Sequence, residues 1–96
     1  MKELSIEKIY NQAFSTVKNL IRKEPETVLS IEKTDQGWKA RVEALERKSI
    51  PDTQDILGRY ELLFNENGEL LGWNQVMVRK RSDRLLPKEE EWVISP

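Results

Sequence analysis

The sequence predicts a two-layer α+β protein, with one N-terminal amphipathic helix packed on a four-stranded antiparallel β-meander. Apolar residues recur at helical spacing early in the chain, runs of branched and aromatic residues follow, and turn signals separate those runs. Strands joined by short turns pair with their neighbours in antiparallel fashion. A chain of 96 residues is sized for one domain, which we place at residues 1–81, with residues 82–96 as a C-terminal tail.

The predicted helix runs from about residue 5 to residue 23. Ser5 is a suitable N-cap, and Pro25 disfavours the helical conformation at Glu24, so the helix is expected to stop there. The apolar residues between these limits recur at steps of one and three, which is a helical period. We expect the stripe to pack on the sheet through Ile6, Ile9, Phe14, Val17 and Ile21.

Four segments are predicted as strands, at residues 28–33, 38–47, 56–64 and about 70–81. The first is rich in branched residues, and the second begins with apolar residues that alternate with charged ones. Gly37 and the pair Asn67 and Gly68 mark the turns after the first and third segments. Pro51 and Asp52 favour a loop between the second and third. The sheet side of the core is expected to contain Trp38, Val42, Tyr60, Leu62 and Phe64.

The composition excludes several function classes. The chain has no cysteine and no histidine, so it lacks disulfides, thiolate nucleophiles, the commonest general base and the commonest metal ligands. We therefore expect no enzymatic activity, no metal and no cofactor. The net charge is −1, which gives no overall field toward nucleic acid or a membrane. The longest uninterrupted apolar run is three residues, so we expect no membrane span and a cytoplasmic protein.

One predicted strand, residues 56–64, is apolar on both faces. Leu57 and Leu63 alternate with the core-facing residues, and a single helix covers only one face of a sheet. The open face, joined by Leu45 and Trp73, is therefore expected to be covered. The sequence leaves open whether the cover is another protein or the chain's own tail, through Leu85, Leu86, Trp92 and Ile94.

The loop before this strand is the other half of a predicted partner-binding surface. Pro51 restricts the backbone, which lowers the entropy lost on binding, and Ile50 and Asp52 offer an apolar contact beside a charge. The alternative is that these residues only shape a turn. The predicted surface consists of Ile50, Pro51, Asp52, Asp55, Leu57, Tyr60, Leu63 and Trp73.

Two chemical hypotheses compete with protein binding. Asp52 and Asp55 could form a carboxylate pair for acid–base catalysis, but nothing else in the chain completes a catalytic constellation. The basic segment 79–84, with Trp73 nearby in sequence, could bind nucleic acid. Against this, the segment is a strand end that the acidic run 89–91 can balance, and the whole chain is slightly acidic. A small nucleic-acid-binding or regulatory module is therefore the alternative function.

The segment from Gly37 to Arg81 resembles a known protein family. It contains a Gly-Trp pair that opens a strand with Val-Glu-Ala-Leu-Glu, then Ile-Pro-Asp-Thr-Gln-Asp-Ile-Leu-Gly-Arg-Tyr-Glu-Leu at residues 50–62, then Asn-Gly-Glu-Leu at residues 67–70 and an aromatic residue. These motifs cover about half of the chain and are similar, in the same order, to the gas vesicle protein O (GvpO) family. The segment at residues 50–61 is long and unusual, so the resemblance is specific.

The resemblance implies an accessory or assembly role in the formation of gas vesicles, the gas-filled protein shells that give microbes buoyancy. It implies that the partners are other gas vesicle proteins and that the protein acts in the cytoplasm, at gas vesicles or their assembly intermediates. It brings no catalytic residues. A second copy of this chain is the other partner that we consider.

Overall fold

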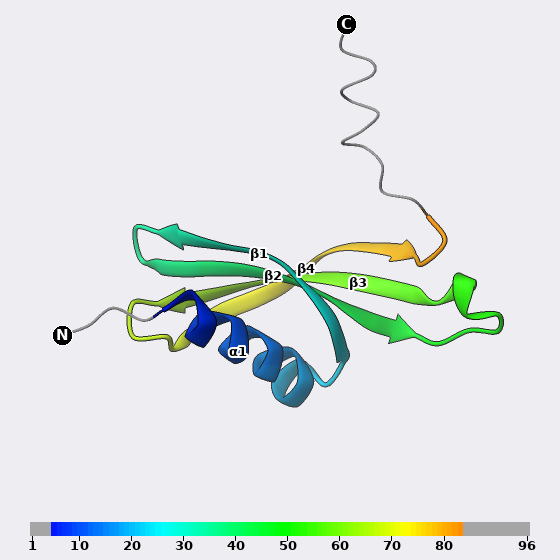
Figure 1. Cartoon of the computed structure of the whole chain (residues 1–96), viewed down its shortest axis with the longest axis horizontal. Helices are drawn as coiled ribbons and strands as arrows, with labels where there is room; N and C mark the ends of the chain where they lie inside the picture. Colours follow the sequence, from blue (N-terminus) through cyan, green and yellow to red (C-terminus); the bar gives the residue numbers. More distant parts are fainter. Residues whose placement is uncertain (1–4, 84–96) are drawn as a thin grey trace, which may run out of the picture.

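The computed structural model describes residues 5–83. Its elements are α1 (Ile6–Thr16), η1 (Val17–Ile21), β1 (Glu24–Thr34), β2 (Gly37–Arg47), η2 (Asp52–Gln54), β3 (Ile56–Asn65) and β4 (Leu70–Lys80). The strands form one sheet in the order β1-β2-β3-β4, and each neighbouring pair is antiparallel. Figure 1 shows the helix on one side of a strongly twisted sheet. The predicted α+β fold, a helix on an antiparallel meander, is confirmed.

The helix begins where the sequence predicts and ends slightly earlier. The hydroxyl of Ser5 accepts a hydrogen bond from the backbone N–H of Lys8 at 3.2 Å, which caps the first turn. The last turn, η1, is π-helical. Arg22 then adopts a left-handed conformation with φ of 66°, and this residue ends the helix rather than Pro25.

Pro25 lies inside β1, which is longer than the predicted 28–33 because it begins at Glu24. β1 is an edge strand, where a residue without an N–H need not interrupt a ladder on both sides. The pairing with β2 shifts between Pro25 and Thr27, as expected where proline interrupts the register. The predicted turn positions hold, since Gly37 and Gly68 have φ of 152° and 86°.

The core lies between the helix and the sheet. α1 packs against β1 and β2, and the buried residues come from one face of each element. Phe14 is half-buried and stacks on Tyr10, with 6.1 Å between ring centroids. Ile6 is 58% exposed, so its predicted core role is wrong: it stands one turn before the first buried helical residue. The core contains Ile9, Ala13, Val17, Trp38, Ala40, Val42, Ala44, Tyr60, Leu62 and Phe64.

Within residues 5–83 no helix has the length and apolar character that crossing a membrane requires. The expected tail contacts through Leu85, Leu86, Trp92 and Ile94 fall outside the described residues.

Candidate partner-binding surface

A loop of eight residues connects β2 to β3, and Asp55 fixes its shape from inside. The Asp55 side chain is 1% exposed. Its Oδ1 accepts a hydrogen bond from the backbone N–H of Ser49 at 2.8 Å, and its Oδ2 accepts one from Nε of Arg81 at 3.2 Å. Lys48 Nζ lies 3.8 Å from the same Oδ2. One carboxylate therefore joins the start of the loop, its end and the segment after β4.

The same contacts determine the protonation state of Asp55. The hydrogen bond from the Ser49 backbone and the nearby Arg81 and Lys48 charges hold the pKa of this carboxyl below its usual range, although burial opposes them. Asp55 is therefore ionised and engaged at neutral pH. A general acid or base needs an accessible proton site with a pKa near the working pH. The arrangement favours a structural role for Asp55 over the carboxylate-pair hypothesis.

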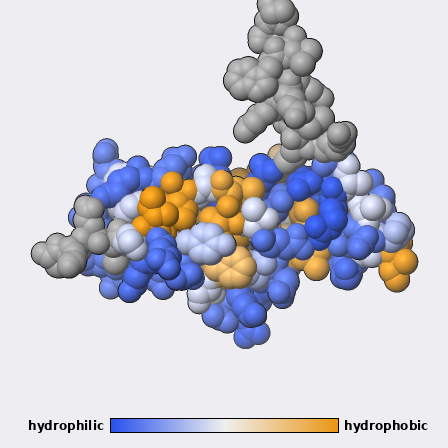
Figure 2. All heavy atoms as spheres, in the orientation of Figure 1, coloured by the Kyte–Doolittle hydropathy of each residue, from blue (hydrophilic) through white to orange (hydrophobic). Residues whose placement is uncertain are grey.

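The tip of the loop, unlike the buried Asp55, is exposed to solvent. Ile50 is 97% exposed, and Pro51 and Asp52 beside it are also exposed. The Ile50–Pro51 peptide bond is cis, and η2 follows it directly. In Figure 2, apolar surface appears at the far end of the molecule where this loop lies. An apolar side chain is thus presented on a loop whose base is held by a buried carboxylate.

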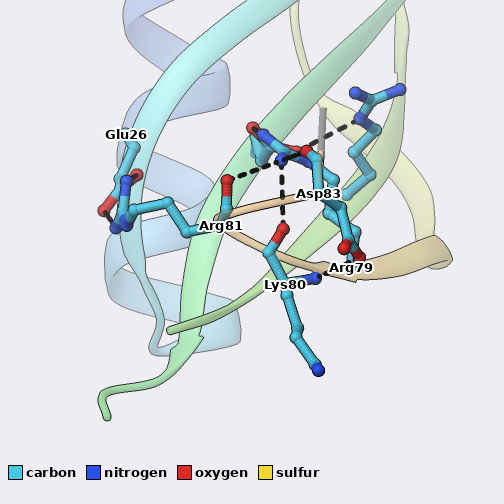
Figure 3. Close-up of polar contacts among 7 residues, drawn as sticks. Glu26, Arg79, Lys80, Arg81 and Asp83 are labelled. Atoms are coloured by element: carbon cyan, nitrogen blue, oxygen red, sulfur yellow. Dashed lines mark hydrogen bonds and ion pairs between the residues drawn. The ribbon is translucent and has the colours of Figure 1, made fainter. Parts of the chain in front are cut away.

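Arg81 extends this anchor to the opposite edge of the sheet. Its Nη1 and Nη2 donate to the two carboxylate oxygens of Glu26 in β1, at 3.1 and 2.7 Å. Figure 3 shows Arg81 directed at Glu26, with Arg79, Lys80 and Asp83 next to it. Sequence reasoning missed Glu26, because the two partners lie 55 residues apart and nothing local marks them. In the sequence Glu26 is an acidic residue next to Pro25, before the predicted strand at residues 28–33.

The sheet face away from the helix differs from the open apolar face that the sequence predicts. Leu57 is 2% exposed, so it does not lie on an open surface. Its neighbours across the ladders are Leu45 and Arg79, and a long arginine stem covers apolar groups well. Leu63 is 39% exposed and remains accessible. The apolar side chain offered on this face is therefore Leu63 rather than Leu57.

Much of the remaining face is covered by ion pairs. Arg79 binds Glu43 through Nε and Nη2, both at 2.9 Å, and Arg59 Nε lies 3.3 Å from the same carboxylate. Burial alone would raise the pKa of Glu43, but the hydrogen bonds and charges of the two arginines outweigh burial and lower it. Charged side chains paired in this way explain how a strand with apolar residues on both faces is accommodated although, within residues 5–83, no helix or strand packs on this face of the sheet.

These contacts also bear on the nucleic-acid hypothesis. Arg79 is committed to Glu43, and Arg81 is committed to Asp55 and Glu26. Phosphate binding draws on basic groups that are free to release counterions on contact. Two of the basic residues that motivated the hypothesis are already neutralised by carboxylates, and Arg84 falls outside the described residues. The geometry therefore gives this alternative little support.

Tyr60 and Trp73 lie on the helix side of the sheet, so the expectation that Trp73 joins Leu57 and Leu63 is wrong. Trp73 pairs with Leu62 across the β3–β4 ladder, which puts it on the same side as the core residues. Its ring centroid is 5.9 Å from that of Tyr60. Tyr60 is 3% exposed, whereas Trp73 is 44% exposed. Only Trp73 of this pair is available to a partner.

The Tyr60 hydroxyl is bound into a small polar network. It contacts the Glu46 carboxylate and accepts a hydrogen bond from Gln75 Nε2 at 3.1 Å. Burial and the adjacent Glu46 raise the pKa of Tyr60 to about 12. Gly58 permits this arrangement, since a Cβ there would lie 2.9 Å from both Gln75 Nε2 and Glu46 Cγ. The network is structural and does not present Tyr60 to solvent.

The described residues contain little that suggests chemistry. Among residues 5–83 no group of three or more acidic, histidine or cysteine side chains could hold a metal ion. Within the same part of the chain, every buried side-chain nitrogen and oxygen has a hydrogen-bond partner. A shallow groove of about 460 Å³ is lined by Glu46, Arg47, Ile56, Gln75 and Val78. What remains prominent is exposed apolar surface, which is typical of protein binding.

Comparisons with a family model and with curated proteins point to the same family. The family model described as "Gas vesicle synthesis protein GvpO" matches residues 1–84. The chain is 35% identical over 72 residues to Gas vesicle protein O1 of Halobacterium salinarum, covering 75% of this chain and 60% of the relative. It is 37% identical over 73 residues to Gas vesicle protein O of Haloferax mediterranei, covering 75% and 52%.

A bacterial relative is equally similar. The chain is 38% identical over 79 residues to Gas vesicle protein O of a Streptomyces species, covering 80% of this chain and 62% of the relative. The matched segment thus spans about half to three-fifths of the length of these curated relatives. No solved structure matches the chain significantly. The resemblance carried by the motifs at residues 37–73 is confirmed.

Proposed function

Because the chain belongs to the gas vesicle protein O family, we propose that it acts in gas vesicle formation as an assembly factor that binds other gas vesicle proteins and catalyses no reaction. Its place of action in this proposal is the gas vesicle or its assembly intermediates. Family membership supports a role in gas vesicle formation, and the exposed loop of the structure supports protein binding as the proposed mode of action. The alternative of a nucleic-acid-binding module is less well supported, since Arg79 and Arg81 are bound to carboxylates.

The observation that carries binding is the exposure of Ile50. Its side chain is 97% exposed at the tip of a loop whose base is locked by Asp55. Burying an apolar side chain this exposed against a partner stabilises the complex, by about 1.5–3 kcal/mol for complete burial. A loop already held in one conformation loses less entropy on binding than a flexible one. Asp52 beside it adds a charge that sets orientation.

The proposed surface is therefore narrower than the one that the sequence predicts. Ile50, Pro51 and Asp52 form the contact group, and Asp55 holds the loop in place. Leu63 and Trp73 are accessible but lie on opposite faces of the sheet. A partner that binds the loop can therefore contact only one of these two residues in addition. Leu57 and Tyr60 support the surface from within.

The proposal is tested by co-purification with the other gas vesicle proteins of the same host and by vesicle counts in cells carrying variants. Ile50→Ala and Asp52→Ala are expected to leave the melting temperature nearly unchanged while reducing co-purification and vesicle yield. Leu29→Ala is the matched control, since Leu29 is an exposed apolar residue on β1, away from the loop. An Ile50→Ala, Asp52→Ala double variant that folds, binds and supports full vesicle formation would contradict the proposal.

A further inference from the structure

β4 is an edge strand that exposes apolar side chains on both faces. It stands last in the strand order, so within residues 5–83 no strand pairs with its outer edge. Such an edge presents a row of free backbone donors and acceptors to another chain. The large apolar residues along it are 39–54% exposed. They are Leu71, Trp73, Val76, Met77 and Val78.

The two edges of the sheet differ sharply in charge. Residues 70–78 of β4 contain no charged side chain, although charged residues make up 34% of the chain. The opposite edge, β1, carries Glu24, Glu26, Glu32 and Lys33. Charges and proline on an edge strand are common protection against unwanted pairing. β1 has both kinds of protection, including Pro25, whereas β4 has neither until Arg79.

We propose that β4 pairs with β4 of a second copy of this chain, in antiparallel fashion about a two-fold axis at Asn74. Asn74 is the midpoint of the uncharged segment. A two-fold interface brings each side chain near the axis close to its own copy, so charges there would repel one another. The nine uncharged residues span about 30 Å at the usual rise of about 3.3 Å per residue. This inference goes beyond the proposed function and does not depend on it.

The register about Asn74 places apolar residues of one copy opposite apolar residues of the other. It sets Leu70 opposite Val78 of the partner copy and Leu71 opposite Met77, so apolar residues flank the axis on both sides. Immediately beyond these pairs, Glu69 of one copy faces Arg79 of the other. Arg79 is already paired with Glu43 of its own copy, so this register is favoured over shifted ones because it brings no two like-charged side chains face to face. Moving the axis toward the C-terminal end would instead bring the Arg79 and Lys80 side chains of both copies together.

The pairing also determines where the exposed apolar residues on the helix side of β4 lie in the dimer. Two sheets joined edge to edge about an axis perpendicular to them form one eight-stranded sheet with both helices on the same face. The helix covers β1 and β2, which leaves Trp73 and Val78 half exposed, and Val78 lines the groove together with Ile56 and Gln75. In the dimer the grooves of the two copies would adjoin in the middle of the sheet. Exposed apolar surface would thus be gathered at the centre of the assembly.

The test is the oligomeric state of the full chain, measured by sedimentation equilibrium over a concentration series. The wild-type chain is expected to form a dimer. Asn74→Lys alone and Asn74→Glu alone are each expected to raise the dissociation constant at least about tenfold, because identical charges meet at the axis. An equal mixture of the two variants is expected to restore the dimer. The mixture can restore the dimer only if residue 74 of one copy lies next to residue 74 of the other.

Two further variants complete the test. Leu29→Lys places a charge on the β1 edge and is expected to leave dimer formation unchanged. Gly72→Lys is a second disrupting variant that the fold should accept, since a Cβ at Gly72 meets no atom within 4 Å. Thermal unfolding followed by circular dichroism checks that each variant folds. A monomeric wild-type chain would overturn the proposal, whether residues 84–96 or a strand of another protein cover β4. A mixture no more dimeric than its components would overturn it as well.

Discussion

Asp55 and Arg81 lie 26 residues apart and are joined twice. Nε of Arg81 donates to the Asp55 carboxylate at 3.2 Å, and the Arg81 backbone N–H donates to the Asp55 carbonyl oxygen at 2.7 Å. The main-chain bond continues the β3–β4 ladder past its last strand pair, Ile56 and Lys80. The side-chain bond makes the geometry of the preceding loop depend on an ionised carboxylate.

This dependence predicts a change of stability in acid. The pKa of Asp55 is lowered in the folded protein, so its stabilising contribution is present above the unfolded value of about 3.9 and is lost as pH falls through the folded value. The difference in free energy of unfolding between the wild type and Asp55→Asn is therefore expected to be largest at neutral pH and to shrink in acid. Urea unfolding at a series of pH values measures it.

Asp52→Asn is the control for this experiment, because Asp52 is exposed at the start of η2. Its free energy of unfolding at neutral pH is expected to stay within about 0.5 kcal/mol of the wild type. A difference between the wild type and Asp55→Asn that is the same at every pH would contradict the role of the Asp55 charge.

The helix provides a second prediction through a matched pair of isoleucines. Ile9 is fully buried and Ile6 is 58% exposed, although they lie on the same side of the helix. Ile9→Ala is expected to lower the free energy of unfolding by about 2–5 kcal/mol, because it leaves a cavity against the sheet. Ile6→Ala is expected to cost less than about 1 kcal/mol. Equal losses in denaturant unfolding would show that the helix is seated differently.

The ion pairs of the open face give a third prediction. Arg79→Ala leaves Glu43, which is 6% exposed, with Arg59 as its remaining partner. The expected loss is about 2–4 kcal/mol, since a buried carboxylate loses its two strongest hydrogen bonds. Arg41→Ala is the control, because the Arg41 side chain is 47% exposed and ion pairs of exposed side chains contribute about 0–1 kcal/mol. If both variants lose the same stability, Glu43 is solvated rather than buried.

Tyr60 provides a spectroscopic prediction. Ultraviolet titration of the folded protein is expected to show a tyrosine that ionises with a pKa of about 12, and Tyr60→Phe is expected to lack it. The stability contributed by the raised pKa is present below the ordinary tyrosine value of about 10 and is lost as pH rises toward 12. A titration in which Tyr60→Phe removes a step near pH 10 instead would place the hydroxyl in water.

The sequence was sufficient for the architecture because local signals and packing agree there. The apolar spacing from Ile9 to Val17 and the Asn67–Gly68 turn each had one good structural interpretation. The end of the helix was misplaced because a proline suggested a stop, whereas Arg22 took up a left-handed conformation before it. Positive φ at an arginine has no sequence signal comparable with that of glycine.

The candidate site was less predictable, since it depends on contacts between distant segments. Pro51 and Asp52 predict the loop at residues 50–55, but Asp55 is held by Arg81, which follows β4, and Leu57 pairs with Arg79 of β4. The alternation along β3 correctly predicts that Leu57 lies on the face away from the helix, but it carries no information about which residues cover Leu57. Trp73 was assigned to the wrong face because the irregular pairing of β3 with β4 moves the alternation along β4 by one residue.

Because α1 packs mainly on β1 and β2, we expect the two halves of the sheet to differ in local stability (Figure 1). Within residues 5–83, backbone amides in β2 are enclosed between a helix and two strands, whereas those of β4 have one neighbouring strand and exposed side chains. In the monomer, amide hydrogen exchange is therefore expected to be slowest in β2 and fastest among the strands in β4, and pairing of β4 with a second copy is expected to slow exchange there. β4 can then open and exchange neighbours while the helix and its core stay folded, which suits a strand that joins and leaves an assembly.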